Sequence, residues 1–370
     1  MTHYFLFGTL RHAPLLTAVA GREVAVTPAR LPGRAAHWVA GAAYPVLIES
    51  PGAAEGQLVT LDAEAARRVD YYEEGFGYLP QDLEVETEAG RCLARVYVPA
   101  EIPETGAPFE IADWSARWGA IATSAAEEIM ARFGHEDASA AHALWPVFAA
   151  RGWAREMGRD PAPAALRTDM GERGAPEVKF REGGHDGFFR LRRFDVRFPQ
   201  YQGGQSRTVT REAFCAFDAA LVLPYDPVTD QVLLIEQFRY GPLMRDDPRP
   251  WVLEPVAGLV DAGEPPIETA RREALEEAHL ELSDIRPMLK VYASPGYSSE
   301  FFHCFLGLAD LDGRGVVHAG LDQENEDIRS HVLPFEEALG HVESGEINAG
   351  PLAMMLLWLA RERAGLRAGA

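Results

Sequence analysis

The sequence predicts an α+β protein of two domains. At 370 residues, the chain is longer than a single hydrophobic core usually supports. Short β-type runs dominate residues 1–100, alanine-rich helical patterns form an expected extension over 101–160, and a new series of strands and helices occupies 179–370. The stretch 161–178 between them is polar and rich in proline and glycine, so we expect the interdomain linker there.

The first half begins with strands and ends with helices. The runs HYFLFG (3–8), EGQLVTL (55–61) and CLARVYV (92–98) are typical of strands, whereas AEAARRVDYYE (63–73) has helical periodicity. The helical extension carries tryptophans that we expect to anchor its packing. They are Trp114, Trp118, Trp145 and Trp153.

The second half opens with a predicted hairpin over residues 218–239. Two apolar runs flank the segment Asp226-Pro227-Val228-Thr229-Asp230, whose residue types favour a turn. Near the end of the chain, PLAMMLLWLA (351–360) is half the length of a membrane span. It therefore predicts a helix packed on the core.

Charge and cysteine content exclude several functional classes. The formal net charge is −21, which disfavours general binding to nucleic acid or to an anionic membrane. Cys92, Cys215 and Cys304 lie far apart, which disfavours a structural zinc site or a disulfide framework. The opening residues also lack the pattern of a signal peptide. We therefore expect a cytoplasmic protein.

The segment from Gly258 to Leu282 predicts an acidic helix that binds a divalent metal ion. Glu273, Glu276 and Glu277 stand at positions i, i+3 and i+4, so they share one helical face and repel one another. A hard cation removes that repulsion, and Mg²⁺ prefers carboxylates while leaving positions open for phosphates. Mn²⁺ is the alternative ion, and a solvated acidic surface is the alternative interpretation.

The same segment has the pattern G-x5-E-x7-R-E-A-x-E-E-x-H-L, which resembles the Nudix box. His279 replaces the glycine of that motif, and we expect it to adopt a positive φ at a cost of about 1 kcal/mol. The resemblance covers residues 180–365 and is to the ADP-ribose pyrophosphatase branch, for which Pro295 is a marker of substrate class. It implies an α/β/α sandwich with a mixed sheet.

The resemblance also implies roles for individual residues. The implied metal ligands are the backbone carbonyl of Ala257 and the side chains of Glu264, Glu273, Glu276 and Glu277. The implied catalytic groups are Glu276, Arg272 and a base at Glu324, with Glu326 as the alternative base. The implied substrate-binding residues are Arg239, Arg211, Glu254 and Pro295, with Arg211 reaching the site of the partner chain in a homodimer formed through this domain.

The implied reaction is metal-dependent hydrolysis of ADP-ribose to AMP and ribose 5-phosphate. Another nucleoside diphosphate derivative, such as NADH or a nucleotide sugar, is an alternative substrate. A non-catalytic sensor of ADP-ribose or of an NAD metabolite is the alternative from a different class. The two-domain arrangement is also similar to that of bacterial tellurite-resistance proteins of the Nudix superfamily. The name of that group describes a phenotype and does not indicate a reaction.

FLFGTLR (5–11) and VDYYEEGFGYLP (69–80) resemble segments of the γ-glutamylcyclotransferase-like family. The resemblance implies a β-barrel with helices over residues 1–100. It also implies that Glu73 is the acid/base and that a loop holds the carboxylate of the substrate. That loop is Gly8, Thr9 and Leu10. Phe7 and Glu74 depart from the family pattern, so an active cyclotransferase and a non-catalytic module both remain open.

Overall fold

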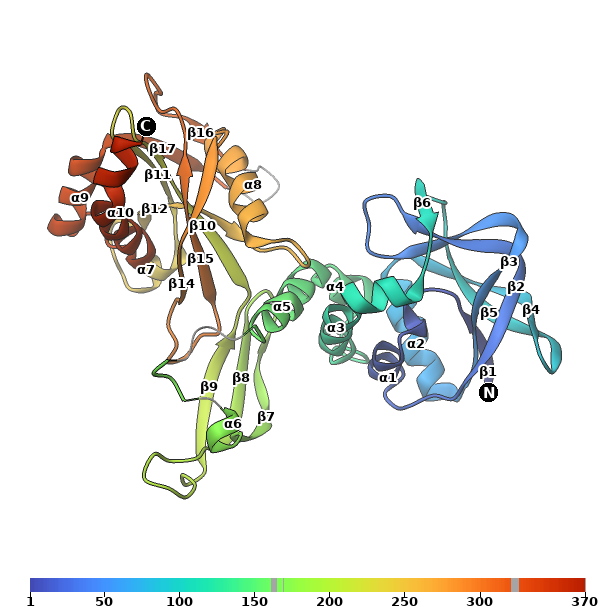
Figure 1. Ribbon diagram of the computed structural model, residues 1–370. Coiled ribbons are helices and arrows are strands. Elements are labelled where there is room, and N and C mark those ends of the chain that lie inside the picture. The colour runs from blue at the N-terminus through green and yellow to red at the C-terminus, as the bar shows by residue number, and fades with distance from the viewer. Residues whose placement is uncertain (161–164, 169, 321–325, 370) are drawn as a thin grey trace. The chain divides into compact units, whose positions relative to one another are not determined.

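The computed structural model describes the chain except for residues 161–164, 169, 321–325 and 370 (Figure 1). It contains two compact units, Met1–Ala162 and Pro163–Ala370. The expected linker, 161–178, spans the division between these units, and its boundaries stay a prediction. Residues 101–160 lie in the first unit.

The described strands of the first unit form a closed barrel. In the order around the barrel they are β3 (Pro45–Leu61), β1 (Thr2–Leu6), β5 (Gly90–Pro99), β4 (Tyr78–Thr87) and β2 (Val26–Val39). The long antiparallel pairing of β2 with β3 closes the barrel, and β6 (Thr105–Pro108) adds to the outer edge of β2. Alternate residues such as Phe5 and Phe7 fill its interior, as the period of a strand requires. The predicted barrel is confirmed.

Helices of the first unit pack outside this barrel. They are η1 (Thr9–Arg11), α1 (Ala13–Ala20), α2 (Ala63–Gly75), α3 (Ile111–Met130), α4 (Ala138–His142) and α5 (Trp145–Met157). The helix predicted at 63–73 is therefore confirmed, and Asp62 caps it by accepting a hydrogen bond from the N–H of Ala65 at 2.9 Å. Trp114 is buried, as expected of a packing anchor.

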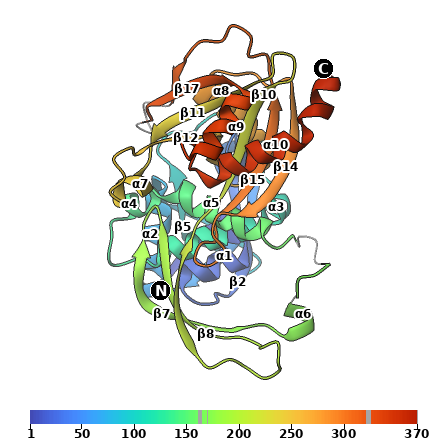
Figure 2. The same ribbon diagram turned by 90° about the vertical axis from the view of Figure 1, so that its left-hand side faces the viewer.

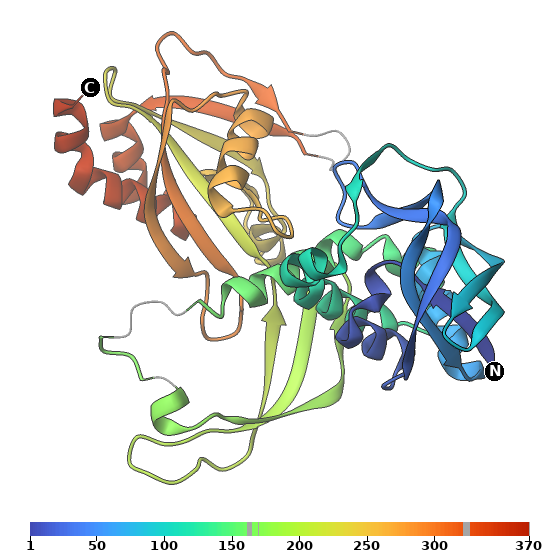
Figure 3. The same cartoon turned by 45° about the vertical axis from the view of Figure 1, so that its right-hand side comes forward.

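The described strands of the second unit form two sheets. The small antiparallel sheet contains β7 (Glu177–Asp186), β8 (Arg190–Arg197) and β9 (Val209–Cys215) and forms a separate ribbon in Figure 3. The large sheet contains β10 (Asp218–Asp226), β11 (Gln231–Phe238), β12 (Trp251–Glu254), β13 (Val256–Leu259), β14 (Asp284–Tyr292), β15 (Phe301–Leu308), β16 (His318–Ala319) and β17 (Ile328–Pro334).

The large sheet is mixed, because β10 pairs with β15 in parallel and with β11 and β13 in antiparallel fashion. Helix α8 (Pro266–Ala278) covers one face, and α9 (Phe335–Ser344) and α10 (Gly350–Ala368) cover the other (Figures 1 and 2). The remaining helices α6 (Met170–Arg173) and α7 (Tyr240–Met244) are short. The predicted α/β/α sandwich and the hairpin at 218–239 are confirmed.

The core beneath α10 explains the apolar run near the end of the chain. Leu352, Met355, Leu356 and Leu359 recur with helical spacing and are buried against the large sheet. The run is thus a packed helix, as predicted. None of the described helices is long and apolar enough to cross a membrane.

Candidate active sites

The face of the large sheet that carries α8 collects the polar residues of the predicted site. Leu253 and Ala257 pack into the core on the opposite face, beneath α10. Side chains alternate along a strand, so Glu254 and Gly258 lie on the α8 face. The strands therefore bring residues from separate segments to one side of the sheet.

Gly258 allows a carboxylate of α8 to approach the strand closely. A Cβ atom at this position would lie 1.8 Å from Oε1 of Glu273, which no side chain tolerates. One helical turn further on, Oε2 of Glu277 accepts a hydrogen bond from the N–H of Ala257 at 2.9 Å. Both glutamates are therefore wedged between helix and sheet, and both are buried. The helical face that the sequence predicted is thus directed at the sheet.

Arg272 contacts the other carboxylates of this segment. Its Nη1 lies 2.6 Å from Glu273 and 3.1 Å from Glu276, and its Nη2 lies 3.2 Å from Glu264. The guanidinium also donates to the backbone carbonyl of Leu259 at 3.3 Å. Burial opposes the ionised form of Glu264, but hydrogen bonds from Arg272 and Thr269 outweigh it and lower its pKa. One arginine thus compensates much of the acidic charge.

The environment of Glu273 and Glu277 still disfavours their negative charge. Burial raises the pKa of Glu273 to about 7, and the neighbouring charges of Glu276 and Glu326 add to the rise while Arg272 opposes it. Burial also raises the pKa of Glu277 well above its usual value, with further contributions from Glu273 and Glu326. Neighbouring carboxylates repel one another, which is why each raises the pKa of the other. A bound cation would remove this repulsion and stabilise the ionised carboxylates.

The donor set therefore fits a divalent metal ion. Hard divalent cations prefer carboxylate oxygens, and the acids at 273, 277 and 326 lie close enough to perturb one another. Among the described residues, no group of three or more acidic, histidine or cysteine side chains already encloses a metal position. The metal role of the Ala257 carbonyl stays a prediction.

Arg239 and Glu254, both predicted to bind substrate, form an ion pair with Nε and Oε2 2.7 Å apart. The side chain of Arg239 is 42% exposed, so a ligand can reach it. Its charge also lowers the pKa of Glu277, which shows that it lies near the acids of α8. Pro295 is exposed in the connection between β14 and β15.

Two predicted residues lie apart from this cluster. Arg211 is exposed on β9 and donates to the carbonyl of Thr210 at 2.9 Å. Within the described part of the chain, no contact joins it to the acids of α8. Glu324, the predicted base, lies outside the described residues. Its alternative, Glu326, acts electrostatically on both buried glutamates.

Sequence reasoning missed two polar residues near Arg239. Gln237 is buried on β11, on the same face as Arg239 by strand alternation, and no described residue bonds its Nε2. A polar residue at a buried strand position is the signal that marks it. Glu300 has a pKa raised by burial and partly lowered by Arg239. Glu300 belongs to no sequence motif that could have identified it.

The end of α8 has the predicted backbone geometry. His279 has φ 46° and ψ 44°, the left-handed conformation that the motif glycine supplies without strain. Arg314, which the sequence did not indicate, donates from Nη2 to the carbonyls of Ala278 at 2.6 Å and His279 at 2.9 Å. These hydrogen bonds satisfy the last carbonyl groups of the helix, although a histidine stands in the glycine position.

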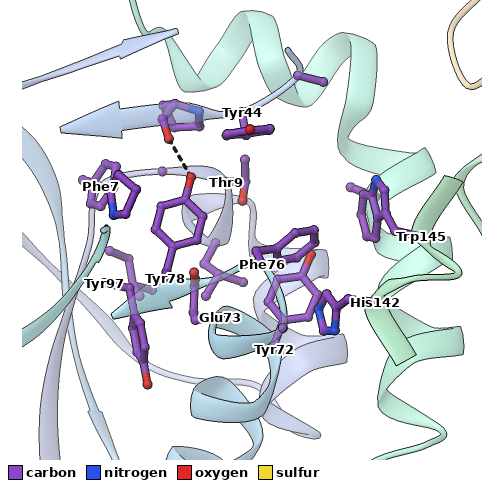
Figure 4. Close-up of a pocket in the computed structure, with 18 of the residues that line it drawn as sticks. Phe7, Thr9, Tyr44, Tyr72, Glu73, Phe76, Tyr78, Tyr97, His142 and Trp145 are labelled. Carbon is purple, nitrogen blue, oxygen red and sulfur yellow. Dashed lines mark hydrogen bonds between the residues drawn. The ribbon is translucent and has the colours of Figure 1, made fainter. Parts of the chain in front are cut away.

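The first unit contains a separate cavity of about 820 Å³. Gly8, Thr9 and Leu10 line it together with Glu73, so the barrel brings the two predicted segments together. Figure 4 shows Glu73 near the middle of this cavity. Burial raises its pKa to about 7, which suits a group that exchanges a proton near neutral pH. Phe7, which replaces the family tyrosine, also lines the cavity.

A barrel with an acidic pocket and a mixed sheet with a glutamate-rich helix define a chain of two enzyme-like modules. The family model for gamma-glutamyl cyclotransferase, AIG2-like proteins matches residues 4–116. The model for the NUDIX domain matches residues 217–353.

Curated relatives match the second unit. The ADP-ribose pyrophosphatase of Escherichia coli strain K12 is 40% identical over 191 residues, which are 52% of this chain and 90% of that protein. The ADP-ribose pyrophosphatase of Haemophilus influenzae is 38% identical over 50% of this chain and 85% of its own length. The GDP-mannose pyrophosphatase of Shigella flexneri is 34% identical over 40% of this chain and 76% of its own length.

The chain therefore belongs to the Nudix family, as a pyrophosphohydrolase whose N-terminal unit is γ-glutamylcyclotransferase-like.

Proposed function

We propose that the second unit hydrolyses the pyrophosphate bond of ADP-ribose to give AMP and ribose 5-phosphate. The observation that carries this proposal is the pair of buried glutamates of raised pKa, Glu273 and Glu277, beside the accessible guanidinium of Arg239. Relatives that align over 90% of their length are named ADP-ribose pyrophosphatase, which supports the choice of substrate.

A divalent ion, Mg²⁺ with Mn²⁺ as the alternative, would be held by Glu273, Glu276 and Glu277, with Glu264 and the carbonyl of Ala257 as further ligands. When bound, such an ion neutralises the charge of the diphosphate and of the acids. Because Glu264 already bonds Arg272, its main contribution is to orient that guanidinium. The acidic chain and the acidic substrate thereby become compatible.

The residues of the chain bind the diphosphate and activate water. The planar guanidinium of Arg239 matches phosphate oxygens, and Glu254 fixes its orientation through the ion pair. The base, Glu324 or Glu326, accepts a proton from water as its oxygen attacks one phosphorus. The bond from that phosphorus to the bridging oxygen breaks, and the departing phosphate takes up the electron pair and a proton.

A substrate panel tests this proposal. ADP-ribose, NADH, ADP-glucose, GDP-mannose and diadenosine polyphosphates are each incubated with the full chain and Mg²⁺, and the products are measured. We expect the largest kcat/KM for ADP-ribose. If another compound is hydrolysed best, the proposed substrate is wrong but the proposed reaction, pyrophosphate hydrolysis, still holds. If ADP-ribose binds without any turnover, the result favours a sensor.

Substitution of one buried acid tests the metal assignment. Glu277→Gln removes a carboxylate that faces the sheet, so we expect kcat to fall by about 100-fold or more. Glu268→Gln is the matched control, because Glu268 lies on the same helix but is exposed. Full activity of Glu277→Gln would exclude this residue as a metal ligand.

We also propose that the second unit forms a homodimer in which Arg211 completes the site of the partner chain. The small sheet that carries Arg211 exposes several large aromatic side chains, a surface that commonly marks an interface. These are Phe180, Phe188, Phe189 and Phe214. Mixing Arg211→Ala chains with Glu277→Gln chains should restore activity, because one site of each mixed dimer is intact. No gain on mixing would contradict the arrangement.

For the first unit, we propose γ-glutamyl cyclotransfer as a second activity. The supporting observation is Glu73, with a pKa of about 7, inside a cavity formed by the segments that carry the family resemblance. The α-amine of the substrate would attack its γ-carbonyl while Glu73 accepts a proton, and the amide C–N bond would break as Glu73 returns that proton to the departing amine. Release of 5-oxoproline, lost in Glu73→Gln, tests this proposal.

A further inference from the structure

The cavity of the first unit extends beyond the part that matches the family model. That match ends at residue 116, whereas the cavity wall includes His142 and Trp145 from α4 and the start of α5. Helix α4 packs against α2, which carries Glu73, and α5 packs against α3. The helical stretch that follows the family domain therefore helps to build the pocket.

Aromatic side chains line this pocket on both sides of Glu73. Figure 4 shows Phe7 and Tyr78 on one side of Glu73, and Phe76, His142 and Trp145 on the other. The ring of Phe76 lies 4.5 Å from that of His142 and 5.1 Å from that of Trp145, with edge-to-face geometry in both pairs. We call these three residues the aromatic wall.

The aromatic wall is held in place by buried contacts. Nδ1 of His142 donates to the carbonyl of Ala138 at 2.7 Å. The ring of His142 also packs directly on Gly75, where a Cβ atom would come within 2.2 Å of Cε1. A fully buried ion pair between Glu128 and Arg151 joins α3 to α5, with Oε2 and Nη2 2.6 Å apart. His142 is therefore held against α2, and α5, which carries Trp145, is joined to α3.

The size and lining of the cavity indicate what the aromatic wall contacts. A volume of about 820 Å³ lies toward the upper end of the range for sites that enclose drug-sized ligands. Phe76 retains 38% exposure even though its neighbours are packed around it. An exposed aromatic edge inside a pocket gains most from a flat apolar group, which it can stack against or meet edge-on.

We infer that this pocket takes a γ-glutamyl amide whose amine part carries an aromatic ring, with that ring on Phe76 and Trp145. The inference rests on the cyclotransferase function proposed above, which places the γ-glutamyl part at Glu73. Cyclisation then forms the bond between the α-amine nitrogen and the γ-carbonyl carbon, breaks the amide bond, and releases 5-oxoproline and the aromatic amine. The aromatic wall thus determines which amines are accepted.

Binding and turnover of two matched substrates test the inference. γ-Glutamyl-phenylalanine and γ-glutamyl-alanine differ only by a phenyl ring, and the full chain is titrated with each by calorimetry and assayed for 5-oxoproline. We expect the phenylalanine compound to bind about tenfold more tightly or better, the effect of burying one ring. Trp145→Ala should reduce the difference to about twofold, and Trp145→Phe should restore part of it.

Trp118→Ala is the matched control, because Trp118 lies on α3 and is not among the residues that line the cavity. We expect it to keep the full preference. Failure of the two proposals is distinguishable. If neither compound releases 5-oxoproline, the cyclotransferase function is wrong, but tighter binding of the phenylalanine compound that depends on Trp145 still supports the aromatic site. Equal binding of the two compounds overturns the inference, whether or not turnover occurs.

Discussion

Arg272 shows how one residue changes the interpretation of an acidic helix. The spacing of Glu273, Glu276 and Glu277 predicted that a divalent ion offsets their repulsion. In the structure, the guanidinium of Arg272 bonds two of these three glutamates, and Glu277 instead bonds a backbone N–H. The arginine alone leaves the pKa of Glu273 and Glu277 raised, so a cation still has a favourable place to bind.

Glu73 gives a prediction about pH at the residue scale. Burial raises its pKa from 4.5 to about 7 in the folded chain, so the folded chain binds more protons than the unfolded chain between these values. The stability that the neutral carboxyl contributes is complete below the unfolded pKa and is lost as pH rises through the folded pKa. Glu73→Gln stays neutral and should therefore stabilise the first unit at about pH 8, by at most about 3 kcal/mol.

Thermal unfolding of Glu73→Gln and of the unchanged protein at about pH 5 and about pH 8 measures this effect. The two proteins should differ little at the lower pH, where Glu73 is mostly protonated. Glu74→Gln is the control, because Glu74 is the exposed neighbour on the same helix. An identical difference at both pH values would show that the pKa of Glu73 is not raised in the folded chain.

At the scale of single elements, α8 ends with measurable strain. His279 holds φ 46° where a glycine pays no steric penalty, so His279→Gly should raise the free energy of unfolding of the second unit by about 1 kcal/mol. The gain is reduced by loss of the contact between Nδ1 and the carbonyl of Leu275 at 3.2 Å. Urea denaturation followed by the fluorescence of the tryptophans measures the change.

As a comparison, Leu275→Gly should lower the free energy of unfolding of the second unit. Leu275 is 54% exposed inside the same helix, where glycine lowers stability by about 1 kcal/mol or more. A destabilising effect of His279→Gly would show that the bonds of the histidine outweigh its backbone strain.

Local sequence predicted the conformation of some elements but not of others. The helix at 63–73 and the hairpin at 218–239 follow from local periodicity and turn residues, and both form as expected. The strand β6 lies within residues 101–160, where composition indicated helices. Thr105 and Pro108 of this short strand pair with β2, so a partner far away in the chain determines its conformation.

At the scale of the whole molecule, each unit has its own hydrophobic core. The barrel encloses one core and the packing of α10 on the large sheet forms another. We therefore expect residues 163–370 expressed alone to fold and to hydrolyse ADP-ribose with kcat/KM within about twofold of that of the full chain. Steady-state kinetics and circular dichroism of this fragment check the prediction. A soluble, folded fragment with much lower activity would show that the first unit contributes to the reaction.

The sequence by itself determined the two modules and the residue types of both sites, because the Nudix pattern and the FGTL and YYEEG segments are local. It also determined the positive φ of His279, since a motif position specifies backbone geometry. Only the tertiary structure decided that Arg239 pairs with Glu254, that Gln237 is buried on the same face, and that α4 and α5 supply the aromatic wall. These features depend on contacts between segments distant in the chain, where burial and electrostatic interaction arise only after folding.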